Sequence, residues 1–93
     1  MAPRWERSSE KHGVPRGDQI HAILHATFTQ ILDEPAGGRA GTIRLFIGPA
    51  HAQTSRELEI LVREYEDGRE AEVFHAMDLG PKYRRYRAER EHD

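Results

Sequence analysis

One histidine, His75, precedes the densest group of positive charges in the chain, which begins with Lys82, Arg84 and Arg85. The ordinary pKa of histidine, about 6.5, suits proton transfer near neutral pH. Cleavage of RNA through its 2′-hydroxyl group needs an acid, a base and cations beside the phosphate, and it needs no metal ion. We therefore predict that His75 is a catalytic acid or base and that the three cations hold the phosphate. The alternative is a histidine that packs in the core.

The basic segment also contains aromatic residues, and the two together are typical of nucleic-acid binding. Positive side chains contact phosphates, and rings stack on bases. The segment has two other interpretations: an exposed helix whose arginines pair with Glu89 and Glu91, or a docking site for an acidic partner. Elsewhere, a Lys-His pair before a glycine and two strand arginines offer further groups. The predicted substrate-binding residues are Lys11, His12, Arg44, Arg63, Tyr83 and Tyr86.

Two more histidines, His21 and His25, have the helical spacing that allows two side chains to bind one metal ion. A third ligand, such as His12 or Asp18, would have to be supplied by the fold. The alternative is a pair of half-exposed polar residues at the edge of an apolar stripe. We favour that alternative, so the sequence predicts no metal site and no cofactor.

Apolar residues recur every three or four positions between residues 18 and 33, which predicts an amphipathic helix. Asp18 is expected in its first turn, where a carboxylate meets free backbone N–H groups. Pro35 and the glycines at positions 37, 38 and 41 predict a loop after the helix. A shorter basic helix is expected from Lys82 to Arg90, because Pro81 suits a first helical turn.

Alternating apolar residues predict strands at 42–48 and 58–63. Asp67-Gly68 then predicts a two-residue hairpin turn, since both central positions of a type I′ turn need positive φ. The predicted pairs are Arg63–Glu72, Val62–Val73, Leu61–Phe74 and Ile60–His75. A slip of one residue would reverse the faces of the second strand.

These elements predict an α+β fold with helices on one face of a small antiparallel sheet of three to four strands. One face would be covered by the long helix, and the other would stay open as a working surface. The covered face would contain Ile43, Leu45, Ile47, Leu58, Ile60, Val62, Val73 and His75. The open face would contain Arg44, Phe46, Glu59, Leu61, Arg63, Glu72, Phe74 and Ala76.

The 93 residues predict one domain over 1–93, with residues 1–10 as a mobile N-terminal arm from which Trp5 packs back. Charged residues make up 32% of the chain and hydrophobic residues 37%, so a partner chain in a hetero-oligomer is expected to add stability. The absence of cysteine excludes disulfides and a thiol nucleophile. No apolar run suits a signal peptide or a membrane span, which predicts a soluble cytoplasmic protein.

The order of the elements and several short strings resemble BrnT-type toxins, which belong to the RelE/ParE superfamily of bacterial toxin–antitoxin modules. Each string is short, but together they cover most of the chain. The matching strings are Trp5-Glu6, Lys11-His12-Gly13-Val14, Leu45-Phe46-Ile47-Gly48, Arg56 followed by Leu58, Ile60 and Val62, then Val73-Phe74-His75-Ala76 and Arg84-Arg85-Tyr86. Where BrnT-like chains tend to have Ser-Ala-Arg, this chain has His75-Ala76-Met77.

The resemblance implies an RNA-cleaving toxin of a type II module, with a RelE/BrnT-like fold and no metal requirement. It also implies a cognate antitoxin, a small protein that neutralises the toxin. The substrate would be mRNA. The alternative function is a non-catalytic protein-binding module of the same fold, which the missing family arginine and the net charge of −2 favour.

Overall fold

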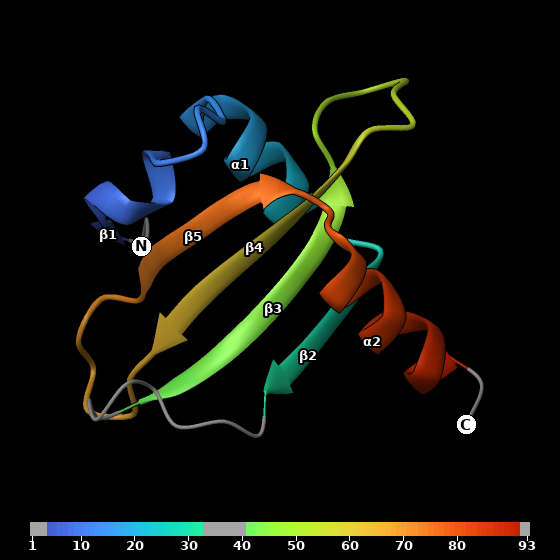
Figure 1. Cartoon of the computed structure of the whole chain (residues 1–93). Coiled ribbons are helices and arrows are strands. Elements are labelled where there is room, and N and C mark those ends of the chain that lie inside the picture. Colours follow the sequence, from blue (N-terminus) through green and yellow to red (C-terminus); the bar gives the residue numbers. More distant parts are fainter. Residues whose placement is uncertain (1–3, 33–40, 92–93) are drawn as a thin grey trace.

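The computed structural model of the protein describes residues 4–32 and 41–91 (Figure 1). It confirms the α+β class. Within the described ranges, no helix is both long and apolar enough to cross a membrane. In chain order the elements are β1 (Arg4–Trp5), the 3-10 helix η1 (Arg7–Glu10), α1 (Arg16–Leu24), β2 (Phe28–Leu32), β3 (Thr42–Pro49), β4 (Glu57–Glu64), β5 (Glu72–Asp78) and α2 (Pro81–Glu91).

The strands form one five-stranded sheet in the order β1-β5-β4-β3-β2. Antiparallel pairs join β2 to β3, β3 to β4 and β4 to β5, whereas β1 pairs parallel with β5. The prediction of three to four strands is therefore wrong in number, and the antiparallel arrangement holds for β2 to β5 but not for β1. The two missing strands are the edge strands, of which β1 has only 2 residues.

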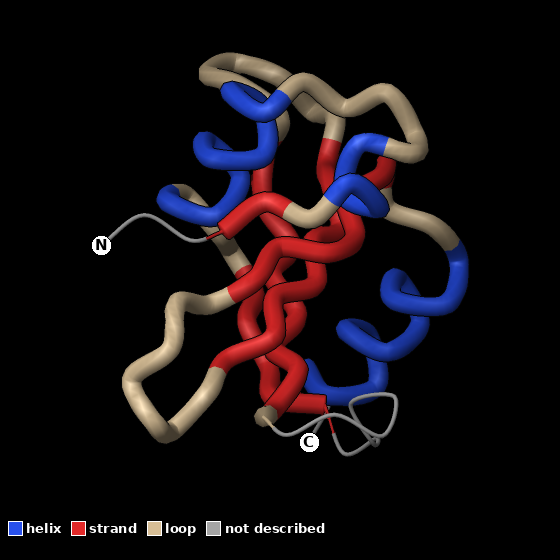
Figure 2. The backbone as a smooth tube through the Cα atoms, turned by 90° about the vertical axis from the view of Figure 1, so that its left-hand side faces the viewer, coloured by secondary structure: helices blue, strands red, loops and turns tan. Residues whose placement is uncertain are grey.

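Helices cover both faces of the sheet, not one, and Figure 2 shows the strands between α1 and α2. The register of β3 and β4 explains this, because Phe46 lies opposite Ile60 and Leu45 lies opposite Leu61. Residues 58, 60 and 62 consequently face α1, while residues 43, 45 and 47 face α2. The core beneath α1 contains Val14, Ala22, Ala50, Leu58, Ile60, Val62, Val73 and Ala76. The core beneath α2 contains Leu32, Ile43, Leu45, Ile47, Leu61, Leu79 and Tyr83.

The helix predicted for residues 18–33 is wrong in its second half, because α1 ends at Leu24 and residues 28–32 form β2. Phe28 and Leu32 are four residues apart, a spacing that places them on one side of a helix and also on one side of a strand. Between them, Thr29 and Ile31 are exposed and β-branched, as strand residues often are. Pairing with β3 therefore decides the conformation of this segment.

The arm predicted for residues 1–10 is, from Arg4 onward, part of the fold. Trp5 pairs with Val73 of β5 and packs against the core beneath α1, as expected of this side chain. The η1 helix follows and runs beside β5, where the Ser8 hydroxyl donates a hydrogen bond to the Phe74 carbonyl. Residues 4–10 are thus held by β5.

The hairpin between β4 and β5 begins in the predicted register and then departs from it. Arg63 faces Glu72 and Val62 faces Val73, as expected, but Leu61 faces His75. A β-bulge therefore makes Phe74 an extra residue in β5. The turn is also longer than predicted, since residues 65–71 connect the two strands. Gly68 has φ of 89°, yet among the described non-glycine residues only Gln53 has positive φ, which excludes a type I′ turn at Asp67.

The basic helix is confirmed as α2, with Pro81 as its first residue. The loop predicted after the first helix lies mostly outside the described residues, since Pro35, Gly37 and Gly38 are not among them. Gly41 is described and has φ of 108°, a conformation that favours glycine.

Candidate active site

His75 lies on the face of the sheet covered by α2 and is hydrogen-bonded to Glu59 of β4. Its Nε2 is 2.8 Å from Glu59 Oε2. The other carboxylate oxygen, Oε1, accepts a hydrogen bond of 2.8 Å from the backbone N–H of Gly80, just before α2. Glu59 is only 4% exposed, so two donors from β5 and the start of α2 satisfy an otherwise buried charge. The prediction that His75 shares a face with Ile60 is wrong, because the bulge moves it to the opposite side.

The Glu59 carboxylate determines which nitrogen of His75 carries the proton. An ionised carboxylate only accepts hydrogen bonds, so the proton of a neutral His75 lies on Nε2. The lone pair is then on Nδ1, which is the atom able to accept a proton. The His75 side chain is 25% exposed, whereas that of Glu59 is 6% exposed. The site therefore combines an accessible imidazole with a buried group that orients it.

A second histidine, His12, lies next to His75. The ring centroids are 5.7 Å apart and the rings meet edge to face at 77°. His12 is exposed and belongs to the turn between η1 and α1, which the contacts of η1 bring alongside β5. The structure therefore brings together two predicted site residues that are 63 positions apart in the sequence.

The three predicted phosphate-binding cations lie in the first turns of α2, and all three are exposed. The Lys82 ammonium lies 5.1 Å from the centroid of the Tyr83 ring. Among the described residues, no hydrogen bond or ion pair joins Lys82, Arg84 or Arg85 to the histidine–glutamate pair. They are free to contact a ligand that approaches the start of α2.

The strand arginines predicted to share one surface lie on opposite faces. Arg44 faces α1 and binds Glu64 through a 2.9 Å contact. Arg63 lies on the α2 face and is 8% exposed. Its guanidinium is 4.5 Å from the centroid of the Phe74 ring and 3.9 Å from Glu72. Only Arg63 is therefore on the same side of the sheet as His75.

Glu72 is the centre of a polar cluster next to Arg63. Hydrogen bonds from the Glu6 carboxyl and the Tyr65 hydroxyl hold the pKa of Glu72 below its ordinary value of 4.5. The charges of Arg4 and Arg63 act in the same direction. Glu72 is therefore ionised near neutral pH, and this cluster fastens β1 to the hairpin.

The tyrosines of α2 mostly serve packing. Tyr83 is 6% exposed and belongs to the core beneath the helix. Tyr86 is half-buried against Phe28 of β2 and carries the Arg90 guanidinium 3.8 Å above its ring. Arg87, for which a pair with Glu91 was one alternative, instead binds Glu57 of β4 through two hydrogen bonds. These contacts attach α2 to the sheet.

Lys11 is exposed beside His12 at the end of η1. Its backbone N–H binds the Ser8 carbonyl, so the turn that presents both side chains is closed by a backbone hydrogen bond. Gly13 follows with φ of 73°, the left-handed conformation expected of a glycine that ends a helical turn.

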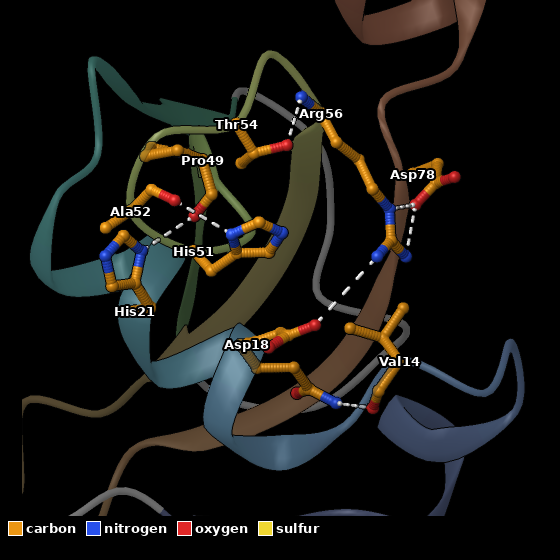
Figure 3. A network of polar contacts seen from close by, with 10 residues as sticks. Val14, Asp18, His21, Pro49, His51, Ala52, Thr54, Arg56 and Asp78 are labelled. Carbon is orange, nitrogen blue, oxygen red and sulfur yellow. Dashed lines mark hydrogen bonds and ion pairs between the residues drawn. The ribbon is translucent and has the colours of Figure 1, made fainter.

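The three histidines considered as metal ligands are not gathered at one point. His21 and His25 stack at 4.4 Å, but His21 Nδ1 is 3.0 Å from the Pro49 carbonyl (Figure 3). His12, the suggested third ligand, instead lies against His75. Within the described ranges, no group of three side chains is arranged to hold a metal ion.

Arg56 connects α1 to the C-terminal end of β5. Its guanidinium contacts Asp78 at 2.8 Å and Asp18 at 3.9 Å (Figure 3). Asp78 follows His75 by three residues in the sequence. This arginine therefore helps to fix the C-terminal end of β5, the strand that contains His75.

Glu59 is the site residue that sequence reasoning missed as a functional group. The signal was a single carboxylate inside the apolar run from Leu58 to Val62. In a strand that is buried on both faces, a charged residue needs partners within the fold.

Comparisons with models of known protein families, with curated proteins and with solved structures give no match for this chain.

Proposed function

We propose that this protein is a metal-independent endoribonuclease in which His75 and His12 exchange protons with RNA. The observation that carries the proposal is the constellation of an imidazole held by a buried carboxylate with a second imidazole 5.7 Å away. Two histidines at one point supply both the base and the acid that this cleavage needs.

In the proposed reaction, Nδ1 of His75 takes the proton from a ribose 2′-hydroxyl group. The 2′-oxygen attacks the adjacent phosphorus, and the bond from phosphorus to the 5′-oxygen breaks. His12, in its protonated form, gives a proton to the leaving 5′-oxygen. The products are a 2′,3′-cyclic phosphate and a 5′-hydroxyl end, and no redox partner is involved.

Cations stabilise the negative charge that builds up on the phosphate in such a reaction. Lys82, Arg84 and Arg85 are exposed at the start of α2, which begins next to the Gly80 N–H that binds Glu59. Lys11 adds a positive charge beside His12. These four residues are the proposed phosphate-binding set.

The biological setting that we propose is a type II toxin–antitoxin module, with mRNA as the target. The support is the resemblance to BrnT-type toxins in the order of elements and in the strings around His12, His75 and Arg85. An α+β fold is compatible with a RelE/ParE-like toxin. A cognate antitoxin would then form a hetero-oligomer with this chain and suppress its activity.

The test is cleavage of a single-stranded RNA by the purified protein in the presence of EDTA. His75→Gln and His12→Gln should each reduce the rate by about 10²–10⁴-fold, because an amide cannot transfer protons at neutral pH. Glutamine at position 75 can still donate to Glu59, which protects the fold. His25→Gln is the matched control, because His25 is exposed just after the last residue of α1 and lies outside the site.

The reaction products provide a second check on this mechanism. A 2′-deoxy sugar at the cleaved position should stop the reaction, and the normal product should carry a cyclic phosphate. Cleavage that His75→Gln leaves unchanged would refute the assigned roles. A well-folded protein that leaves RNA intact, and leaves a bacterial host growing on expression, would favour the non-catalytic binding module.

A further inference from the structure

The β-bulge in β5 places two aromatic rings next to each other on one face of the sheet. Successive strand residues normally point to opposite faces, but Phe74 is the extra residue of the bulge. Val73 and Ala76 face the core beneath α1, whereas Phe74 packs at the margin of the core beneath α2. His75 points to that same face, where it binds Glu59. An unbroken strand would have separated the two rings.

The Phe74 ring is half-buried and is supported by a buried cation. The Arg63 guanidinium lies 4.5 Å from the ring centroid, and the Arg63 side chain is 10% exposed. Its Nε atom is buried without a hydrogen-bond partner, and its Nη1 atom lies 3.9 Å from a carboxylate oxygen of Glu72. The guanidinium thus lies over the Phe74 ring in a cation–π contact that holds the ring in place.

We propose that Phe74 is a stacking platform for a nucleotide base next to the cleavage site, with Arg63 as a positioning residue behind it. This inference rests on the proposed ribonuclease function and specifies its substrate class. A base can lie on an aromatic side chain only when it is unpaired, because the bases of a duplex are covered by their neighbours. The preferred substrate is therefore single-stranded RNA, bound with one base on Phe74 and the adjoining phosphate at His75.

The platform and the acid–base pair are positioned by the same short segment. Ser8 donates a hydrogen bond to the Phe74 carbonyl, and the chain from Ser8 leads within four residues to His12. The contact of η1 with β5 thus fixes the position of His12 relative to the bulge. A base on Phe74 would bring its ribose and phosphate to the space between the two histidines.

The experiment measures the binding of a fluorescent single-stranded RNA with 2′-O-methyl sugars, which the protein cannot cleave, by fluorescence anisotropy. Phe74→Leu keeps an apolar side chain but removes the ring, and it should weaken binding by about 5- to 100-fold, the usual effect of one lost base stack. Phe46→Leu is the matched control, because Phe46 is half-buried on the opposite face of the sheet. The same sequence as a duplex should bind more weakly, with no difference between the wild type and Phe74→Leu.

Cleavage of the unmodified RNA by the wild type separates failure of the platform from failure of the proposed function. If the wild type cleaves RNA while Phe74→Leu binds the single strand as tightly as Phe46→Leu does, the platform is refuted and the nuclease stands. If the wild type neither binds nor cleaves RNA, both proposals fail. Equal loss of binding in both leucine variants, or a preference for the duplex, would also overturn the platform. Thermal unfolding of each variant verifies that the fold is intact.

Discussion

Replacing Glu59 with glutamine tests whether a buried carboxylate orients His75 in the candidate site. The substitution keeps the size of the side chain and removes its charge. The new amide oxygen can still accept the Gly80 N–H, which leaves the amide NH₂ group facing His75 Nε2. Because two donors cannot bond to each other, His75 must move its proton to Nδ1. In the proposed mechanism that change removes the lone pair that accepts the proton from RNA.

The size of the effect follows from the contacts at Glu59. A hydrogen bond to a charged group contributes about 1.5–3 kcal/mol and a neutral one about 1 kcal/mol, a difference of about 0.5–2 kcal/mol. Glu59 makes two such bonds, so Glu59→Gln should lower the free energy of unfolding by about 1–4 kcal/mol. The rate of RNA cleavage should fall by about 10²–10⁴-fold, because Nδ1 of His75 would already carry a proton and could not accept one. Glu59→Ala should be more destabilising, since the Gly80 N–H would lose its partner.

The assay is urea denaturation of the wild type, Glu59→Gln, His75→Ala and the double variant. With a slope of about 1–3 kcal/mol per molar urea, a loss of about 2 kcal/mol shifts the midpoint by roughly 0.7–2 M. The two substitutions should be non-additive, with a coupling of about 1–3 kcal/mol. Glu66→Gln, at an exposed hairpin residue, is the control and should change neither stability nor cleavage. Additivity within about 0.5 kcal/mol would refute the pairing of Glu59 with His75.

Two further predictions concern the fold. Gly48→Ala should destabilise the protein by more than about 2 kcal/mol or prevent folding, because a Cβ atom there would clash with the Ala22 carbonyl near the end of α1. Gly17→Ala is the control, because a Cβ atom at position 17 would meet nothing within 4 Å. It should be neutral, or stabilising by up to about 1 kcal/mol, in the same denaturation assay. The lowered pKa of Glu72 stabilises the fold above its ordinary value of 4.5, and this contribution is lost as pH falls through the lower pKa of the folded state. Denaturation between pH 6 and pH 3 should therefore show the stability difference between wild type and Glu72→Gln shrinking toward acid pH, and a constant difference would contradict this reasoning.

Several features of this protein could be predicted from local sequence. The alternating apolar residues at 42–48 and 58–63 indicated β3 and β4, because that period matches a strand whatever its neighbours are. The Gly80-Pro81 boundary indicated the start of α2. The same local signals placed His75 in a strand that precedes a basic helix, and the structure has that order, with His75 in the middle of β5.

Other features depended on contacts between distant segments. Residues 28–32 carry apolar side chains at a spacing that suits both a helix and a strand, and pairing with β3 selects the strand. The register of β3 against β4 decides that two apolar rows face opposite sides of the sheet. A local sequence pattern predicts neither feature, because each depends on the free energy of contacts between segments that are distant in the sequence.

The same distinction between local sequence and distant contacts applies to the candidate site. The sequence supplied His75, His12 and the cations as residue types with suitable chemistry. Only the tertiary structure decided that a bulge brings His75 to the α2 face, that Glu59 binds it and that His12 lies beside it. The physical reason is that a bulge is set by packing on both faces of a hairpin at once. One extra residue reverses the direction of a side chain, and the hairpin sequence alone does not reveal it.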